Sequence, residues 1–262
     1  MQYETIQFER RGAGAWIILN RPKEMNAISV RMLDELETAL IECQSDNSVR
    51  VVVLSGNGSA FCAGADLKEV LSSIKNPVPG AKDFLDRCDD VFGFLRRLPK
   101  PVIAALNGIT LAGGLELAMC CDLVFAAESA KIGDAHSNFG VFPGAGGAAI
   151  LPRKIGLNRA KYLLFSGDFL PAAELEKFGL VNQVVPDADL IGEVEKFTEK
   201  LATKSPLVLR RMKEVANASL DQTQEAALRH EMLNLRQHCR SYDLEEGLRA
   251  FADKRKPEFK GY

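Results

Sequence analysis

Two short segments contain residues that could stabilise an anion with backbone groups. They run from Gly58 to Lys68 and from Asn107 to Ala118, and each passes from a predicted strand through small residues into a predicted helix. The first turn of a helix presents unpaired backbone N–H groups and a partial positive charge. Small residues let a ligand approach such a backbone closely. Two of these helix starts facing each other could hold an oxygen that becomes negative during a reaction; the alternative is a pair of tight turns whose glycines serve packing.

One carboxylate is spaced so that it could act beside the second of these segments. Glu116 lies three residues after Gly113, about one helical turn, so its side chain is expected to point back toward the start of the helix. Its neighbours Leu115 and Leu117 are apolar. The spacing therefore favours a general acid or base in an apolar pocket, and the alternative is a glutamate on the helix surface.

His136 is a second candidate for proton transfer. The chain has three histidines, and the other two, His230 and His238, lie in the predicted helical C-terminal part. An imidazole titrates near neutral pH and can give or take a proton. Asp134, two residues earlier, could orient the imidazole or could serve only the turn. His136 is thus predicted either to move a proton or only to shape the pocket.

The elements that must position these residues are predicted from apolar runs. Four β-branched or apolar runs read as strands, at 15–19, 49–54, 101–106 and 122–127. The runs are nearly continuous, which is typical of strands covered on both faces, and amphipathic helical patterns follow them. Residues 72–81 are predicted to form a loop because they are rich in Pro, Gly, Ser and Asn. Repeated strand–turn–helix units predict an α/β fold with mostly parallel strands.

Composition and charge narrow the class of protein. The 262 residues carry a formal net charge of -2, which argues against a general nucleic-acid binder. No apolar run reaches membrane-spanning length, and no cluster of residues has the spacing of a metal site. The six cysteines show no CxxC pair and are read as reduced. Because residues 1–4 resemble neither a signal nor a transit peptide, a cytoplasmic protein or a mature matrix form is expected.

Several motifs, in order along almost the whole chain, resemble the enoyl-CoA hydratase/isomerase (crotonase) family. They are Leu19-Asn20-Arg21-Pro22-Lys23, Phe61 to Leu67, Asn107 to Glu116, Gly140 to Gly147, Phe178 to Asn182 and Lys254 to Gly261. The resemblance implies an α/β fold, a crotonase-like ββα spiral core over 1–190 with the acyl-CoA site. It also implies an all-helical C-terminal trimerisation region over 191–262. The expected assembly is a homo-oligomer, either a trimer or a dimer of trimers.

The resemblance assigns roles to the candidate residues. It implies that the backbone N–H groups of Ala65 and Gly113 form the oxyanion hole for the thioester oxygen of an acyl-CoA. Glu116 then corresponds to one of the two catalytic glutamates of the family's hydratases. The second glutamate is expected four residues before Gly140, where this chain has His136 instead.

The resemblance also implies a role in fatty acid metabolism. Coenzyme A is then the carrier of the acyl substrate, and no separate cofactor is expected. Eight residues are expected around the coenzyme A part: Lys23, Met25, Ala63, Asp66, Leu67, Lys68, Phe259 and Lys260. Basic side chains among them would meet the phosphates, and Phe259 would pack on the adenine. The alternative for the C-terminal residues is a solvated tail.

Hydration of a 2-enoyl-CoA is the first prediction, because Glu116 and both oxyanion segments are intact. The replacement at His136 keeps three alternatives open. These are an enoyl-CoA isomerase that needs a single base, an acyl-CoA hydrolase in which His136 activates water, and a non-catalytic member that binds CoA or RNA. The identity of the acyl chain is left open by the sequence.

Overall fold

A six-stranded sheet forms the centre of the protein. The computed structural model describes residues 3–262; Met1 and Gln2, at which the predicted first region begins, lie outside the described residues. In order across the sheet, the strands are β1 (Ile6–Arg11), β2 (Gly14–Leu19), β3 (Val51–Gly56), β5 (Val102–Leu106), β7 (Leu123–Ala127) and β10 (Gln183–Val185). Only β1 runs antiparallel to its neighbour; the other pairs are parallel. The four predicted strands are thus confirmed.

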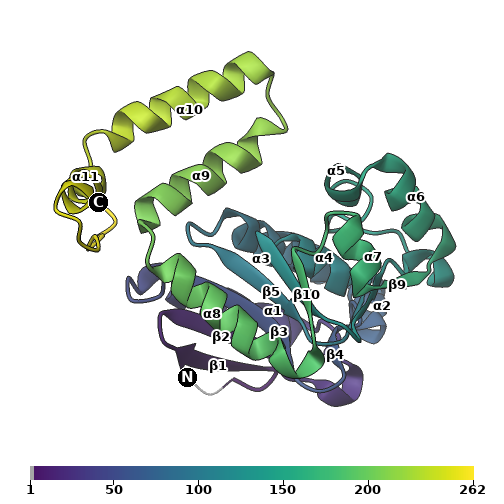
Figure 1. Cartoon of the computed structure of the whole chain (residues 1–262). Helices are drawn as coiled ribbons and strands as arrows, with labels where there is room; N and C mark the ends of the chain where they lie inside the picture. The colour runs from purple at the N-terminus through teal and green to yellow at the C-terminus, as the bar shows by residue number, and fades with distance from the viewer. Residues whose placement is uncertain (1–2) are drawn as a thin grey trace.

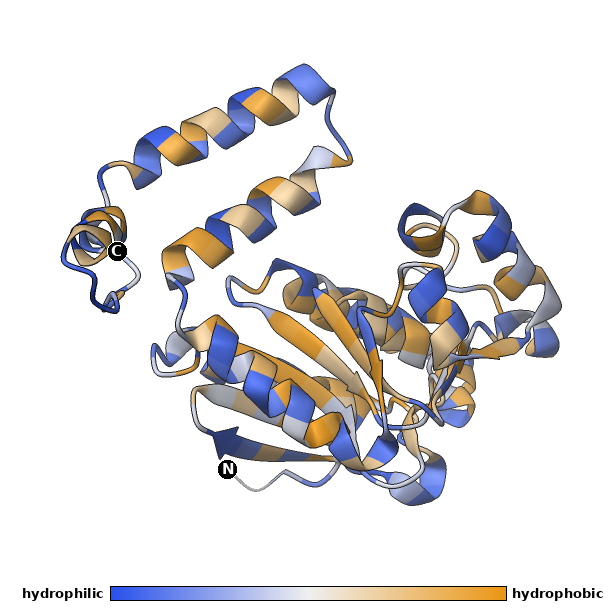
Figure 2. Ribbon diagram, in the orientation of Figure 1, coloured by the Kyte–Doolittle hydropathy of each residue, from blue (hydrophilic) through white to orange (hydrophobic). Residues whose placement is uncertain are grey.

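The central strands are apolar because both of their faces are covered. All of β5, and β3 as far as Ser55, are buried, and Figure 2 shows the middle of the sheet as hydrophobic. Helix α8 (Leu190–Ala202) packs across β2, β3, β5 and β7 and lies in front of the sheet in Figure 1. Helix α1 (Val30–Ser45) packs on β1 and β2 and against α3 (Phe84–Arg97). The near-continuous apolar pattern of the sequence has this burial as its cause.

A second, four-stranded sheet holds the segments that follow the central strands. Its order is β4 (Ala60–Cys62), β6 (Ile109–Leu111), β8 (Lys131–Gly133) and β9 (Phe169–Pro171), with β4, β6 and β8 mutually parallel. Each of β3, β5 and β7 is followed by a strand of this second sheet. Helix α2 (Leu67–Lys75) then follows β4, and α4 (Gly113–Met119) follows β6. The chain therefore winds as repeated ββα turns.

The remaining helices lie outside the two sheets. They are α5 (Leu151–Ile155), α6 (Leu157–Ser166), α7 (Ala172–Lys177), α9 (Pro206–Ser219), α10 (Gln224–His238) and α11 (Tyr242–Ala252), together with 3-10 turns at Pro22–Glu24, His136–Phe139 and Asp187–Asp189. Beyond β10, residues 186–262 contain helices and turns but no strand. Helices α9 to α11 project away from the sheets in Figure 1, and neither α9 nor α10 buries a residue in the single chain.

The loop predicted over residues 72–81 is shorter than expected. Helix α2 continues to Lys75 and is capped at its start by Asp66, whose side chain accepts a hydrogen bond from the Lys68 amide. The irregular segment begins only at Asn76. The prediction was wrong for residues 72–75 because this cap and the apolar face of the helix extend a helix through a polar stretch.

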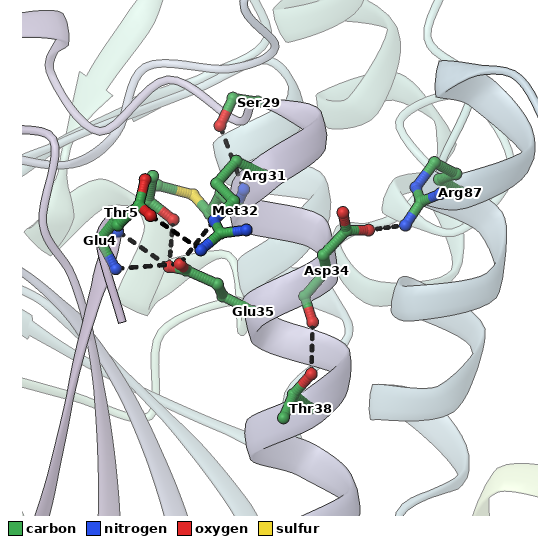
Figure 3. Close-up of polar contacts among 9 residues, drawn as sticks. All are labelled: Glu4, Thr5, Ser29, Arg31, Met32, Asp34, Glu35, Thr38 and Arg87. Atoms are coloured by element: carbon green, nitrogen blue, oxygen red, sulfur yellow. Dashed lines mark hydrogen bonds and ion pairs between the residues drawn. The ribbon is translucent and has the colours of Figure 1, made fainter. Parts of the chain in front are cut away.

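A buried carboxylate ties the beginning of the described chain to helix α1. Glu35 accepts hydrogen bonds from the amides of Glu4 (2.9 Å) and Thr5 (2.8 Å), and from the Thr5 hydroxyl (2.6 Å). It also pairs with Arg31 at 2.9 Å, as Figure 3 shows. Burial alone would raise the pKa of Glu35, but these hydrogen bonds outweigh burial and lower it. The contact holds β1 and α1 together.

Candidate active site

Three neighbouring parallel strands bring the predicted site residues together. At their carboxyl ends, β4 leads to Ala65, β6 leads to Gly113, and β8 leads to Asp134 and His136. Carboxyl ends of parallel strands meet at one edge of a sheet, which is where α/β proteins build binding sites. Segments far apart in sequence, from Ala65 to His136, thus meet because of the strand order β4-β6-β8.

The amides of Ala65 and Gly113 are neighbours with unused donors. A Cβ placed on Gly113 would lie 3.3 Å from the Ala65 nitrogen, so a side chain there would crowd the space beside that amide. Within residues 3–262, no hydrogen bond from either amide to a backbone carbonyl is found in the loops, turns and helix caps. Gly113 is the first residue of α4, where the N–H has no partner within the helix. Ala112, just before it, has a φ of 49°, a strained conformation of the kind found at functional sites.

Glu116 is held by the backbone with one oxygen left over. Its side chain is 4% exposed, and Oε1 accepts hydrogen bonds from the amides of Ala145 and Gly147, both at 2.8 Å. Its other oxygen, Oε2, lies 3.8 Å from Nε2 of His136. The surface glutamate considered from the sequence is excluded by this burial. The carboxylate is instead fixed through Oε1, and its Oε2 is directed toward the imidazole.

Asp134 holds the opposite side of the His136 ring. Nδ1 of His136 lies 2.9 Å from Oδ1 and 3.0 Å from Oδ2 of Asp134, and the His136 backbone N–H donates to Oδ1 at 3.1 Å. Burial lowers the pKa of His136, but the hydrogen bond to Asp134 and the negative charges of Asp134 and Glu116 together raise it above its usual value of 6.5. The imidazole is thus biased toward its protonated form.

These groups face one mostly apolar cavity of about 430 Å³. Ala65, Gly113, Glu116 and His136 all line it. Most of the rest of its wall is hydrophobic and comes from α2, α3 and residues 139–145: Leu67, Val70, Phe84, Leu85, Cys88, Phe92, Phe139, Val141, Phe142, Gly144 and Ala145. Such a cavity suits an apolar chain attached to a carbonyl that reaches the two amides. The chain after Gly147 leads into α5, which begins at Leu151, and no residue of α5 lines the cavity.

Six of the residues expected around coenzyme A lie near the cavity. Ala63 and Leu67 line its wall, and the Ala63 amide donates to the Met25 carbonyl at 3.0 Å. Asp66 caps α2 and pairs with Arg21 at 3.1 Å. Lys23 and Lys68 are exposed on neighbouring segments. Of these six residues, Ala63 and Leu67 line the cavity, and the other four lie on the segments next to them in the chain or bonded to them.

The other two residues are not brought to the cavity within one chain. Phe259 lies against Gly247 of α11, and the Lys260 ammonium stacks 4.7 Å from the centre of the Tyr242 ring. Both belong to the helical part that projects away from the core in Figure 1. Their place at the site stays a prediction that requires a neighbouring subunit.

Two groups that hold the site were not assigned from the sequence. One is Asp134, for which the sequence leaves open whether it orients His136 or serves only the turn. The other is the pair of amides of Ala145 and Gly147 that bind Glu116; they belong to the motif from Gly140 to Gly147, to which the sequence assigned no such role. A Cβ on Gly147 would lie 2.9 Å from Asp134 Oδ2 and 3.3 Å from Glu116 Oε1, so the glycine permits this close approach.

Neither a metal-binding cluster nor a membrane-spanning helix is found in the described part of the chain. Over residues 3–262, no group of three or more His, Cys, Asp or Glu side chains is arranged to hold a metal ion. Among the same residues, no helix is long and apolar enough to cross a membrane.

Comparison with known proteins supports the resemblance. Residues 9–262 match the family described as Enoyl-CoA hydratase/isomerase. The chain is 40% identical to a probable enoyl-CoA hydratase of Rhizobium meliloti and 37% identical to the crotonyl-CoA hydratase of Syntrophomonas wolfei, each over 99% of both chains. The crystal structure of an enoyl-CoA hydratase from Bacillus anthracis superposes with a TM-score of 0.91 at 36% identity, covering 99% of this chain and 100% of that one. The predicted fold is confirmed.

Proposed function

Because the chain belongs to the enoyl-CoA hydratase/isomerase family, we propose that it adds water across the double bond of a 2-enoyl-CoA. The observation that carries this proposal is the convergence of four groups on one apolar cavity. Two backbone amides, a buried carboxylate with a free oxygen and an imidazole all line it. Relatives over the full length are named enoyl-CoA hydratase and crotonyl-CoA hydratase, which is the same chemistry.

The two amides stabilise the charge that hydration creates. When water attacks C3 of the enoyl thioester, the electron pair of the double bond moves toward the carbonyl, and the thioester oxygen becomes an enolate oxygen. The N–H groups of Ala65 and Gly113 donate to that oxygen. One well-aimed donor of this kind lowers the barrier by about 3 kcal/mol.

Glu116 and His136 move the protons. Oε2 of Glu116 accepts a proton from the attacking water, whose oxygen bonds to C3. The protonated imidazole of His136 gives a proton from Nε2 to C2 of the enolate, which completes the addition. The proton on Glu116 then passes to His136, whose Nε2 lies 3.8 Å away in the free protein, and both groups return to their starting states. His136 thereby does the work of the family's second glutamate.

The coenzyme A part binds at the opening of the cavity. The backbone of Met25, Ala63 and Asp66 takes the polar groups of adenine and pantetheine, while Lys23 and Lys68 supply positive charge to the phosphates. Leu67 contacts the pantetheine arm. A protein with a net charge of -2 needs such local cations to hold a polyanionic carrier.

A homo-oligomer, as a trimer or dimer of trimers, completes the molecule. The helices α9 to α11 expose large apolar side chains in the single chain, among them Met212, Leu228, Met232, Leu233, Leu235, Leu248 and Phe251. Packing them against neighbouring subunits removes that area from water, and it brings Phe259 and Lys260 of one chain to the carrier bound by another. Light scattering after size-exclusion chromatography tests this assembly, and a monomer at micromolar concentration would contradict it.

The protein works in a reducing compartment, the cytoplasm or a comparable one. All six cysteines are free thiols, and four of them are buried. The purified protein is exposed to mild oxidation, and the number of free thiols is then measured by mass spectrometry. Loss of activity together with loss of free thiols shows that the protein depends on a reducing compartment.

Product analysis tests the proposed reaction directly. The protein is incubated with 2-enoyl-CoAs of several chain lengths, beginning with crotonyl-CoA, and the products are identified by mass spectrometry. Hydration adds the mass of one water to the thioester. A product of unchanged mass with a shifted double bond indicates an isomerase, and release of free CoA indicates a hydrolase. Binding of CoA without turnover of any of these thioesters contradicts all three enzymatic functions.

A further inference from the structure

Asp134 is buried beside the site with one side-chain partner. The residue has no exposed surface, and among residues 3–262 its carboxylate receives hydrogen bonds only from the backbone and ring nitrogens of His136. A residue that served the turn alone would need only the backbone contact, through Oδ1. Here both oxygens also approach Nδ1 of the ring, at 2.9 Å and 3.0 Å. The second set of contacts concerns the imidazole and not the turn.

Two buried carboxylates share this one imidazole. Glu116 approaches Nε2 and Asp134 approaches Nδ1, so the ring lies between them. Within the described chain, neither carboxylate forms an ion pair with a lysine or an arginine. Burying a carboxylate is costly unless a donor or a positive charge compensates it. A His136 that carries protons on both nitrogens satisfies both carboxylates.

The charged groups that act on the ring come from two elements. Asp134 belongs to the loop after β8, and Glu116 belongs to α4. Helix α6 packs against the 3-10 turn that carries His136, and its C-terminal end is joined to that turn by the Asn138 side chain, which donates to the Gly167 carbonyl at 2.9 Å. In residues 3–262, α6 contributes no ion pair to the ring. The protonation of His136 therefore responds mainly to Asp134 and Glu116.

We propose that Asp134 is a positioning residue that holds Nδ1–H of His136, so that Nε2 faces Glu116 and the cavity as a proton donor. This inference rests on the proposed function, in which His136 returns a proton to the enolate. Asp134 is not among the residues of the cavity wall. It acts through the imidazole, by setting the tautomer and by favouring the charged form.

Proton donation by His136 depends on pH. The pKa of His136 is raised, so the donating form is present below that pKa and is lost as the pH rises through it. The alkaline limb of kcat/KM then follows the titration of His136. Removing the charge of Asp134 moves this limb to lower pH.

The test uses Asp134→Asn in the full chain, with Asp168→Asn as a matched control. Asp168 is exposed and lies directly before β9, the strand that pairs with β8. Its carboxylate accepts a hydrogen bond from the Tyr162 hydroxyl. In the Asp134→Asn variant, the side-chain amide can present its NH₂ group to Nδ1 of His136. This contact moves the ring proton to Nε2 in the neutral form and stops the ring from being held as a cation. We expect kcat to fall about 100-fold or more, with the alkaline limb displaced to lower pH. Asp168→Asn leaves both unchanged.

A second readout does not depend on turnover. Nitrogen-15 NMR of histidine-labelled protein follows the tautomer and titration of His136, which His136→Gln identifies among the three histidines. We expect wild type to show a protonated Nδ1 and a titration above pH 6.5, and Asp134→Asn to titrate at lower pH with the other tautomer.

The outcomes separate the inference from the proposed function. An unchanged tautomer and titration in Asp134→Asn overturns the positioning role, whatever the activity. Loss of activity with an unshifted pH profile also overturns the positioning role, because a structural defect alone would lower the activity without moving the pH profile. If the NMR changes as expected while no enoyl-CoA is hydrated by wild type, the positioning role stands and the proposed reaction fails.

Discussion

Replacing Glu116 by glutamine separates the chemistry of this carboxylate from its structural role. Oε1 of Glu116 accepts from two backbone amides at 2.8 Å, and the carbonyl oxygen of a glutamine can accept the same two bonds. The NH₂ group then takes the place of Oε2, beside His136. The opposite orientation would set an NH₂ against two N–H donors and is disfavoured. The variant should therefore fold with the side chain in place but without a base.

The expected loss follows from general base catalysis. A positioned base contributes about 10²- to 10⁴-fold, which corresponds to about 3–5 kcal/mol of barrier at about 1.4 kcal/mol per decade. We expect kcat to fall within this range, with KM changed less than tenfold, because the acyl-CoA still meets the same cavity wall and the same two amides.

The assay is the disappearance of crotonyl-CoA followed by absorbance, at saturating substrate. Glu128→Gln is the matched control, since Glu128 is exposed and is not among the residues that line the cavity, and it should keep the wild-type rate. Thermal unfolding of both variants checks that the fold is intact. A folded Glu116→Gln protein with a rate within tenfold of wild type would disprove the assignment of this carboxylate as the base.

Substitutions at Gly113 and Glu35, and alkylation of the cysteines, test other contacts of the structure. Gly113→Ala places a methyl group 3.3 Å from the neighbouring donor amide and should lower kcat/KM about 100-fold. Glu35→Gln should destabilise the fold by about 1–3 kcal/mol near pH 7; because the pKa of Glu35 is lowered from 4.5, this difference is present above pH 4.5 and is lost as the pH falls through the lowered pKa. At pH 8, iodoacetamide should modify the exposed Cys239 first, since burial raises the pKa of Cys88 to about 12.

Each of these predictions has a control and a contrary result. Gly192→Ala, where a Cβ meets no atom within 4 Å, should keep full activity, and equal rates in the two glycine variants would contradict the oxyanion role. For Glu35, chemical denaturation between pH 3 and pH 7 is the measurement, and a constant difference would show that its charge is irrelevant. For the thiols, peptide mapping by mass decides, and early modification of Cys88 would contradict its protection.

Local sequence signals were enough to predict the strands, the family and the principal candidates of the site. The continuous apolar run Val51–Leu54 and the glycines and small residues around Ala65 and Gly113 are signals of this kind. They predict a covered strand and close backbone approach without knowledge of distant partners. The glutamate one turn into a helix is likewise a local geometry, and burial of Glu116 agrees with it.

Which distant groups act on one another depends on the three-dimensional packing. The order β4-β6-β8 brings Ala65, Gly113 and His136 to one edge, and strand order depends on long-range pairing that no local pattern specifies. The partnership of Asp134 with His136 depends on the full burial of Asp134 beside a partly buried imidazole, which decides whether an Asp-x-His spacing is a turn or a charged pair. Phe259 and Lys260 pack against α11, away from the cavity, because the contacts of a chain end are set by the packing of whole helices and subunits rather than by its own residues.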